Sequence, residues 1–463
     1  MEIVLRDYQI HAIESVRNSY KKGKTAPLLV MPTGAGKTIC FSKIAQSATI
    51  LNKKVLILVH RSELLNQACA KLTQFGITHG KISPQFKPEY HIPVQVASVD
   101  TIIKRLEFIE KPDLIIIDEA HHAIKNNKWG RVIEQFPEAK ILGVTATPTR
   151  LNGDGLGVHA KGFFDDLIVG TGIQELTNKG YLVPAIYYAP PARIQLEKVK
   201  IENGDYSIRE LSEQTNLPDI TGDAIKHYIN ISNNLPAIAF CVDRKHAQDV
   251  AINFKNAGIS SDYIDGSQSF KERQSKIDRL SNGKIKVLTS VNVVSEGTDI
   301  PTVTTAIILR KTKSLALHLQ MIGRILRPAD NKKDAIVIDH VGNVVEHGFA
   351  NSTHLWSLDT KIKRPSNSEF IMQCPNCYCA FDFRRERFCP SCGHQFETGK
   401  SKMTYSSEDL VLLSEQDLSP KVKEIRSAKT VEDLEVLRQK YGYKPGWVFV
   451  MKKYLPQHRS FNL

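Results

Sequence analysis

The sequence lacks a long apolar segment. Its apolar runs, such as Val55–Val59 and Leu114–Ile117, have the length of β-strands and fall short of the roughly 18 residues that a membrane-spanning helix needs. The N-terminal stretch has no apolar core of a secretory signal and places charges at Glu2, Arg6 and Asp7. We therefore expect a chain that stays inside the cell and has no membrane partner.

Cysteine is scarce outside one short cluster. Of the eight cysteines, Cys40, Cys69 and Cys241 lie far apart in apolar surroundings, and we predict that they are buried thiols. The other five fall between Cys374 and Cys392. This distribution excludes a small disulfide-bonded scaffold, and in an intracellular chain the cluster favours a metal site.

The composition excludes a disordered chain and a single small domain. Apolar residues make up 41% of the 463 residues and charged residues 24%, as in folded globular proteins. The length favours two or three domains, because domains usually run to about 100–200 residues. The net charge of +13 suits a polyanionic partner such as nucleic acid, although an inert basic surface has the same charge.

Residues 1–150 alternate short β-branched runs with helical stretches, which predicts a doubly wound parallel α/β sheet. A helix is expected over 62–75, where Leu64, Leu65 and Leu72 share one face. The expected strands are Ala26–Met31, Lys54–His60, Val94–Ser98, Asp113–Asp118 and Ile141–Val144.

A second α/β domain is expected after a glycine-rich connector over 151–180. The alternation resumes over 181–345, with strands expected at Ala237–Val242, Lys286–Ser290, Thr304–Leu309 and Ala335–Asp339. The remaining chain divides into a linker over 346–369, the cysteine module over 370–398 and a basic C-terminal module over 399–463. In that last module, Thr430 followed by Asp433 predicts the start of a helix that runs through Lys440.

A phosphate loop is predicted between the first strand and the helix that follows it. The segment Met31-Pro-Thr-Gly-Ala-Gly-Lys-Thr38 has small residues whose backbone N–H groups can surround phosphates at a helix N-terminus. It departs from the strict G-x-x-x-x-G-K-[ST] pattern at Met31. Lys37 would reach the β and γ phosphates of ATP, and the Thr38 hydroxyl would ligate Mg²⁺. The predicted nucleotide-binding residues here are Pro32, Thr33, Gly34, Ala35, Gly36, Lys37 and Thr38.

Two adjacent carboxylates end a buried strand about eighty residues later. In Leu114-Ile-Ile-Ile-Asp-Glu-Ala-His121, the strand end is the place where a doubly wound sheet keeps its ligands. Asp118 would hold Mg²⁺, and Glu119 would orient or deprotonate the attacking water. A solvated acidic strand end is the other reading of an Asp-Glu pair, and the preceding phosphate loop disfavours it.

These two segments resemble motifs I and II of the superfamily-2 helicases and translocases, which use paired RecA-like domains. The resemblance covers about residues 1–345 and continues with seven further segments, of which five are as follows. Leu5-Arg6-Asp7-Tyr8-Gln9 resembles the element whose glutamine contacts adenine. Val59-His-Arg-Ser-Glu-Leu-Leu-Asn-Gln67 and Val96-Ala-Ser-Val-Asp-Thr101 resemble motifs Ia and Ib, Gly143–Arg150 resembles motif III, and Ile238–Val242 resembles motif IV.

The resemblance implies further site residues. Motifs Ia and Ib imply contacts from Arg61, Gln67 and Thr101 to a nucleic-acid backbone, although polar groups at such positions often only cap helices. Motif V, which ends in Ser295–Pro301, implies that Gly297 and Asp299 lie near the nucleotide.

The segment His318–Arg327 matches the Q-x-x-G-R-x-x-R pattern of motif VI. Arginine suits a phosphoryl group in transfer, because its guanidinium stays protonated and presents a rigid fork. Arg324 and Arg327 are three residues apart, so on a helix they would share one face. Both could then point into a cleft between this domain and the domain with the phosphate loop. Surface ion pairs are the alternative for these two arginines.

The cysteine cluster predicts a structural zinc ribbon. Cys374-Pro-Asn-Cys377 and Cys389-Pro-Ser-Cys392 are two C-x-x-C knuckles with eleven residues between them, a spacing that fits a short hairpin. These four cysteines are the predicted Zn²⁺ ligands. Cys379 and His394 could compete as the fourth ligand.

The whole architecture, two RecA-like domains followed by a zinc ribbon and a basic tail, is similar to the RadD-type, XPB-related DNA helicases. This resemblance implies an ATP-dependent DNA helicase or translocase with a role in repair, recombination or replication. It also implies a cytoplasmic, nucleoid-associated protein whose partners include DNA and a single-strand-binding or other repair protein. Two alternatives stay open, namely a DEAH-box RNA helicase and a zinc-containing adaptor without ATPase activity.

Overall fold

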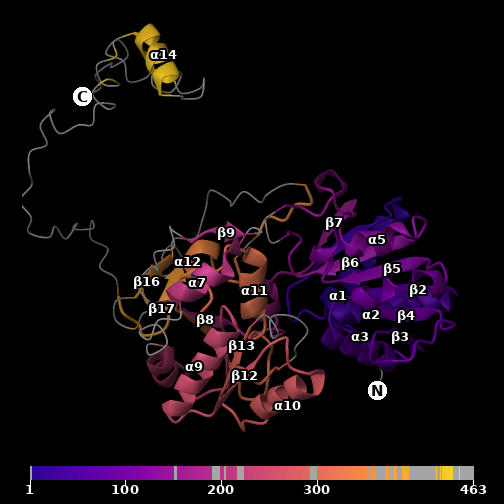
Figure 1. Cartoon of the computed structure of the whole chain (residues 1–463), viewed down its shortest axis with the longest axis horizontal. Helices are drawn as coiled ribbons and strands as arrows, with labels where there is room; N and C mark the ends of the chain where they lie inside the picture. Colours follow the sequence, from indigo (N-terminus) through magenta and orange to yellow (C-terminus); the bar gives the residue numbers. More distant parts are fainter. Residues whose placement is uncertain are drawn as a thin grey trace, which may run out of the picture. The chain divides into compact units, whose positions relative to one another are not determined.

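The computed structural model describes residues 3–150, 154–189, 199–202, 205–215, 224–291, 300–352, 354–359, 371–374, 377, 379–382, 388–395, 424, 428, 430–441 and 448. The chain divides into two compact units, residues 1–396 and residues 397–463. The first unit contains two large sheets with their helices, and a small two-stranded sheet (Figure 1).

Seven parallel strands form the first sheet in the order β3-β4-β2-β5-β6-β1-β7. The strands are β1 (Pro27–Val30), β2 (Val55–Val59), β3 (Gly80–Ile82), β4 (Val94–Ser98), β5 (Leu114–Asp118), β6 (Lys140–Thr145) and β7 (Asp166–Val169). The helices are α1 (Asp7–Lys21), α2 (Lys37–Ile50), α3 (Ser62–Gln74), α4 (Val99–Ile102), α5 (Lys128–Glu134) and α6 (Ile173–Asn178).

Successive side chains of the central strands point to opposite faces of this sheet, and apolar side chains cover both faces. Ile57 packs in the cluster that contains α1, α2 and α3 side chains, whereas its neighbours Leu56 and Leu58 pack in the cluster that contains Trp129 of α5. The predicted doubly wound sheet is therefore confirmed, with both faces covered.

The predicted connector is partly sheet. Its residues 166–169 form β7, which pairs in parallel with β1 from Pro27↔Asp166 to Val30↔Val169. The sequence of β7 is short and its side chains are half-buried or, at Val169, exposed, so its local pattern carries little strand signal.

The second sheet has the order β12-β13-β11-β14-β15-β8-β17-β16. Its strands are β8 (Ala185–Tyr188), β11 (Ala237–Phe240), β12 (Ser261–Ile264), β13 (Val287–Ser290), β14 (Thr305–Ile308), β15 (Ala335–Asp339), β16 (Ile371–Gln373) and β17 (Cys379–Asp382). The helices here are α7 (Ile208–Thr215), α9 (Arg244–Asn256), α10 (Phe270–Ser281), α11 (Leu315–Gly323) and α12 (Asn343–His347), with a π-helical turn, Tyr228–Ser232. A separate two-stranded sheet joins β9 (Ile201–Glu202) to β10 (Asp205–Tyr206).

The cysteine module is part of this second sheet, where the sequence predicted a separate small domain. β17 pairs antiparallel with β8 through Cys379↔Tyr188 and Ala380↔Tyr187, and β16 pairs with β17. The Tyr188 hydroxyl also lies 3.2 Å from Oγ of Ser391. The module continues the sheet edge because β8, as the outermost parallel strand, leaves its backbone groups available for pairing.

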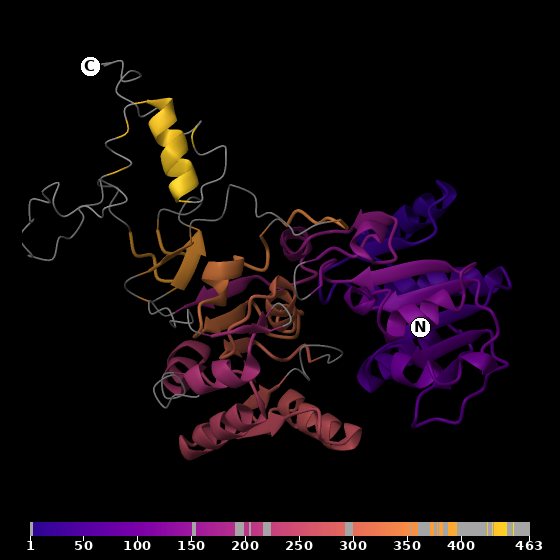
Figure 2. The same ribbon diagram turned by 45° about the horizontal axis from the view of Figure 1, so that its top comes forward.

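Between α12 and β16, before the second sheet is complete, the chain returns to the first domain. In the predicted linker, the backbone N–H of Gly157 donates to the Leu358 carbonyl at 2.8 Å, and a Cβ on Gly155 would overlap that same carbonyl. Trp356 and Leu358 pack against the apolar cluster of the first domain that includes Leu156 and Phe164. We call residues 354–359 the return segment; it is drawn in orange beside the first domain (Figure 2).

The second unit contains α14 (Val431–Lys440). Its predicted N-terminal cap is confirmed, because Thr430 Oγ1 accepts from the Asp433 N–H at 3.1 Å and Asp433 accepts from the Thr430 N–H at 3.0 Å. Leu434 and Leu437 form a small apolar cluster with Ala428.

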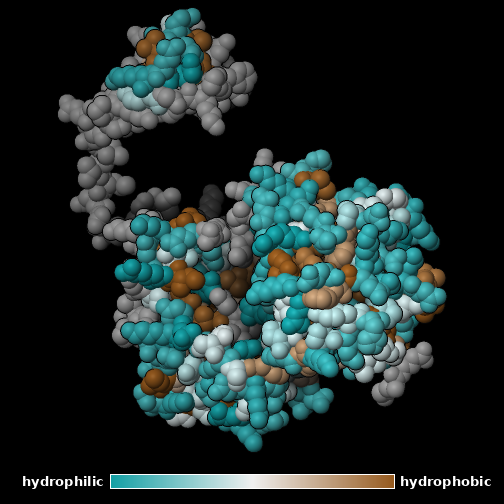
Figure 3. All heavy atoms as spheres, turned by 45° about the vertical axis from the view of Figure 1, so that its right-hand side comes forward, coloured by the Kyte–Doolittle hydropathy of each residue, from teal (hydrophilic) through white to brown (hydrophobic). Residues whose placement is uncertain are grey.

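None of the helices in the described ranges has the length and the hydropathy that a membrane crossing needs. Figure 3 shows a face on which hydrophilic side chains prevail, with separate smaller apolar patches.

Candidate functional site

The loop between β1 and α2 has a backbone that only glycine adopts readily. Gly34 has φ +87° and Gly36 has φ +82°, both in the left-handed region. A Cβ on Gly36 would also overlap Nε2 of Gln9. Because α2 begins at Lys37, the N–H groups of its first turn are available to an anion beside the loop.

Charged groups from the end of β5 and from the segment after α11 act on Lys37. Its Nζ donates to the Met31 carbonyl at 3.3 Å. Burial lowers the pKa of Lys37, and the negative charges of Glu119 and Asp118 oppose that shift, whereas the positive charges of Arg324 and Arg327 add to it. The other four predicted catalytic residues are therefore within electrostatic reach of Lys37.

The two carboxylates at the end of β5 are almost fully buried. Asp118 is 4% exposed and Glu119 is 6% exposed, and Glu119 has a left-handed backbone with φ 49°. Burial raises the pKa of Asp118 to about 6, with a further rise from the charge of Glu119 and an opposing effect of Lys37. A carboxylate in this setting is a good ligand for a hard cation, because a bound cation supplies the missing countercharge.

His121 joins this strand end to the next strand. Its Nδ1 lies 3.4 Å from Oε2 of Glu119 and 3.1 Å from Oγ1 of Thr145. The Thr145 hydroxyl in turn donates to the Thr147 carbonyl at 2.9 Å. No role was predicted for His121, although its place two residues after Glu119 was the signal that could have identified it.

The sequence predicted that Arg324 and Arg327 lie on a helix. The structure contradicts this placement. α11 ends at Gly323, Arg324 follows it as the C-cap residue, and Arg327 lies in the loop beyond. This segment still packs on the phosphate loop. A Cβ on Gly323 would come 2.6 Å from Cβ of Thr33, and a Cβ on Gly34 would come 3.3 Å from Cγ of Arg327.

Gln9 lies against the phosphate loop and is 2% exposed. Its Oε1 accepts from the Arg6 N–H at 3.0 Å, and its Nε2 donates to the Ala35 carbonyl at 3.4 Å. The Tyr8 hydroxyl donates to the same Ala35 carbonyl at 3.0 Å. These contacts place the predicted adenine-contact residue beside the loop.

The remaining predicted residues are placed as follows. Pro32, Thr33 and Ala35 are part of the loop, and Thr38 lies in the first turn of α2. Gly297 and Asp299 lie outside the described residues.

The predicted nucleic-acid contacts differ in exposure. Arg61 precedes the first turn of α3 and donates from Nε to Nε2 of His60 at 3.1 Å, and Gln67 lies on α3 with its side chain half-buried. Thr101 lies in α4 and is 7% exposed, so its side chain offers little surface to a strand.

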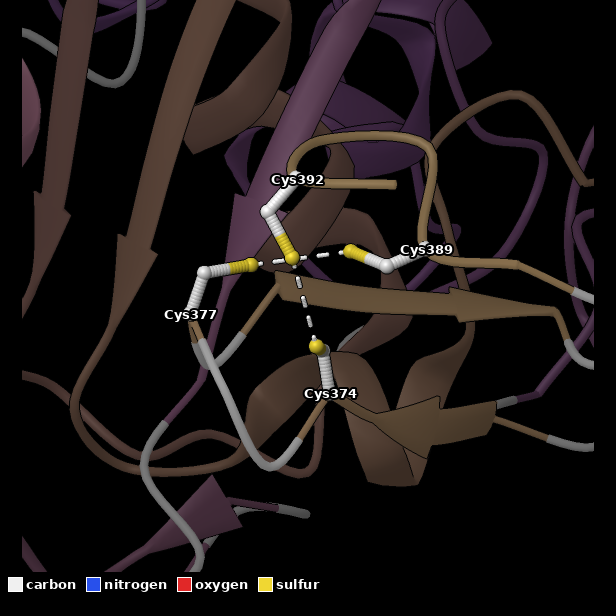
Figure 4. Close-up of side chains that lie close together, drawn as sticks. All are labelled: Cys374, Cys377, Cys389 and Cys392. Atoms are coloured by element: carbon white, nitrogen blue, oxygen red, sulfur yellow. Dashed lines mark hydrogen bonds between the residues drawn. The ribbon is translucent and has the colours of Figure 1, made fainter. Parts of the chain in front are cut away.

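Four cysteines of the two knuckles bring their sulfur atoms together (Figure 4). All four sulfurs lie within 4.8 Å of one another, with 3.7 Å between Cys374 and Cys392 and 3.5 Å between Cys377 and Cys389. Burial raises the pKa of Cys377 to about 12, and the neighbouring thiols add to the shift. Four closely packed thiols fit a tetrahedral Zn²⁺ ion, which stabilises the thiolate form.

Comparison with known proteins agrees with this arrangement. Residues 2–150 match the family model described as the res subunit of type III restriction enzymes, and residues 221–329 match the helicase conserved C-terminal domain. The chain is 33% identical over 401 residues to a 51.5 kDa protein of a Lactococcus phage (isolate 7-9), an alignment that covers 85% of this chain and 84% of the phage protein. The chain belongs to the superfamily-2 helicases. It is therefore an ATP hydrolase.

Two further similarities connect this superfamily-2 helicase to named proteins. It is 25% identical over 383 residues to the DNA 3'-5' translocase XPB2 of Sulfurisphaera tokodaii, covering 73% of this chain and 82% of that protein. It shares its fold with the ATP-dependent type ISP restriction-modification enzyme LlaBIII, solved bound to DNA, at a TM-score of 0.52 and 21% identity. That match covers 73% of this chain and 28% of the other.

Proposed function

We propose that this helicase couples ATP hydrolysis to movement along DNA and acts in DNA repair, recombination or replication. The observation that supports this most is the packing of the second domain's Gly323–Arg327 segment on Thr33 and Gly34 of the phosphate loop. That packing brings Arg324 and Arg327 within electrostatic reach of Lys37. A site divided between two domains closes when ATP binds and opens after hydrolysis, so the domains can move along a bound strand.

In this proposal, each group of the site has one role in ATP binding or hydrolysis. The glycine loop, the α2 N-terminus and Lys37 hold the β and γ phosphates. Thr38 and Asp118 hold Mg²⁺, which neutralises phosphate charge when it is bound. Glu119 orients the attacking water and accepts its proton, and His121 and the Thr145 hydroxyl fix the position of the Glu119 carboxylate.

Arg324 and Arg327 stabilise the charge that develops on the γ phosphoryl group, as a residue of the opposite domain does in other phosphoryl-transfer enzymes. Gln9 recognises the adenine edge, and Gly297 and Asp299 complete the nucleotide site from the second domain.

The proposal of DNA as the track rests on charge and on relatives. The net charge of +13 favours a polyanion, and the similar proteins include a DNA translocase and an enzyme solved with DNA. Arg61, Gln67 and Thr101 are the proposed contacts to the strand in the first domain.

We further propose that Cys374, Cys377, Cys389 and Cys392 bind one structural Zn²⁺. A site closed by four thiolates leaves no open coordination position, so it stabilises the fold and does no chemistry.

The test is steady-state ATP hydrolysis by the purified protein without polymer and with single-stranded DNA, duplex DNA, forked DNA or RNA. We expect one DNA form to stimulate ATP hydrolysis strongly, and that form identifies the DNA along which the protein moves. Lys37→Ala and Glu119→Gln should lose at least about 100-fold in turnover, and Arg327→Ala about 1,000-fold. All three variants should still bind DNA.

Selective stimulation by RNA would make RNA, in place of DNA, the proposed substrate. Full turnover in Lys37→Ala or Glu119→Gln would overturn the assignment of the site.

A further inference from the structure

A short segment between α6 and β8 runs along the phosphate loop. Lys179 pairs with Asp7 at 2.9 Å, which ties this segment to the start of α1. A Cβ on Gly34 would come 3.2 Å from Cδ2 of Leu182, so the segment lies directly on the loop. The Val183 N–H donates to the Leu326 carbonyl at 2.8 Å, between the two arginines of the second domain.

Tyr181 of this segment supports the guanidinium group of Arg6. The Arg6 Cζ lies 4.3 Å from the centroid of the Tyr181 ring, a cation–π contact. Nη1 of Arg6 also donates to the Tyr8 hydroxyl at 3.3 Å, and the rings of Tyr8 and Tyr181 are 5.2 Å apart. Arg6 is otherwise exposed, so one face of its guanidinium is held by a ring while the residue remains open to solvent.

This exposed cationic plane lies beside the proposed nucleotide site. The Arg6 N–H is bonded to Gln9, and both Tyr8 and Gln9 donate to Ala35 of the phosphate loop. A planar guanidinium stacks well on a planar heterocycle, and it stacks best when its own orientation is already fixed.

We propose that Tyr181 is a positioning residue for the nucleobase of ATP, because it holds Arg6 flat as the platform on which adenine stacks. The inference deepens the proposed function and rests on it. The Tyr181 ring contacts Arg6 and Tyr8, so we expect its effect to be confined to the base. Because Val183 is bonded to Leu326, this arrangement also connects base binding to the arginine-bearing loop of the second domain.

The experiment compares the binding of MgATP with that of inorganic tripolyphosphate, which carries the phosphates without a base. Calorimetry is carried out on the full chain and on Tyr181→Ala, Tyr181→Phe and Tyr90→Ala. Tyr90 stacks on Phe108 at 5.6 Å outside these contacts and controls for the loss of a partly buried ring.

We expect Tyr181→Ala to raise the Kd of ATP by about 3- to 30-fold and to leave the Kd of tripolyphosphate unchanged. Tyr181→Phe keeps the ring face and should bind ATP like the wild type, as should Tyr90→Ala. In steady-state turnover, Tyr181→Ala should raise KM for ATP and keep kcat within about twofold.

Equal weakening of ATP and tripolyphosphate in Tyr181→Ala would show that the ring only supports the loop, and unchanged ATP binding would show that it supports nothing at the site. Either result overturns the inference. A wild-type protein that binds ATP but hydrolyses none with any polymer would overturn the proposed function alone, since the binding comparison would still decide the role of Tyr181.

Discussion

Arg273 and Glu63 form an ion pair that joins the two domains. Nε of Arg273, on α10, donates to Oε1 of Glu63 at 2.9 Å, and Nη2 contacts the same oxygen. Both side chains are largely buried, at 13% and 12% exposed. Burial alone would raise the pKa of Glu63, but the hydrogen bond and charge of Arg273, together with hydrogen bonds from the Glu63 backbone N–H and from Ser62, hold that pKa below its usual value. Glu63 lies in the first turn of α3, two residues after Arg61, so the pair lies next to a proposed strand contact.

Arg273→Ala should weaken the closed arrangement of the two domains. Loss of a charged hydrogen-bond partner typically costs about 1.5–3 kcal/mol, so we expect nucleic-acid-stimulated ATP turnover to fall about tenfold or more. The matched control is Arg279→Ala on the same helix, which removes a more exposed pair to Asp262 within the second domain. Equal stimulation in wild type and Arg273→Ala would refute a coupling role for the pair.

Gly36→Ala should lose ATP binding for a local steric reason. The added methyl would overlap the Gln9 amide, in addition to the strain of φ +82°. Gly23→Ala is the control, because Gly23 has φ +84° but no heavy atom within 4 Å of a Cβ. Both variants should lose about 1 kcal/mol in the free energy of unfolding, and only Gly36→Ala should bind ATP weakly in calorimetry. Equal ATP affinities of the two variants would contradict the steric argument.

Acid should destabilise the second domain through its buried histidines. Burial lowers the pKa of His246 to about 4 and that of His340 to about 3, whereas both return to about 6.5 on unfolding. The unfolded state then binds more protons, so the free energy of unfolding is greatest above pH 6.5 and falls as the pH drops towards 4.

His246→Gln should reduce this pH dependence by up to about 1.4 kcal/mol per pH unit, measured by denaturant unfolding between pH 7 and pH 4.5. His11→Gln is the control, since His11 is exposed on α1. An unchanged slope in His246→Gln would show that His246 is not a source of the acid sensitivity.

Zinc content should separate the four proposed ligands from their two competitors. Cys377→Ser should lose zinc, whereas Cys379→Ala and His394→Ala should keep one ion per chain, because neither belongs to the group of four sulfurs. Metal analysis of the purified variants measures this directly. No zinc in the wild-type protein would remove the metal site from the proposal.

Removal of the metal by a chelator should also increase hydrogen exchange in the second domain. Since β17 pairs with β8, loss of the metal should speed hydrogen exchange of the Tyr187 and Tyr188 amides. The amides of β2 in the first sheet serve as the internal control and should not respond.

The elements with strong local signals were predicted well. Val94–Ser98 and Ala335–Asp339 match their expected bounds, because both are short, valine- or isoleucine-containing segments of the kind that favours a strand. β7 and β8 were missed, since each has only four residues and is held mainly by a partner strand that is distant in the sequence. The attachment of the cysteine module to β8 was missed for the same reason.

The site likewise has residues that lie in contiguous motifs and contacts that join distant segments. Lys37, Asp118 and Glu119 could be predicted because each lies in a contiguous motif whose spacing reflects the chemistry. The pairing of Arg273 with Glu63 spans 210 positions, and the contact of Tyr181 with Arg6 joins two segments that share no pattern. Such contacts are set by packing between domains, which no local pattern records.

The return segment changes how the two domains can move. The chain connects them once through residues 170–184 and touches the first domain again at Leu358, on the Gly155–Gly157 backbone. These two attachments run through the backbone and define an axis, whereas the Arg273–Glu63 pair is a side-chain contact that can break. Rotation about that axis leaves both attachments intact, whereas straight separation or sliding must break one. The cycle of ATP binding and release should therefore follow one swinging motion, whose direction is set by where the chain crosses between the domains.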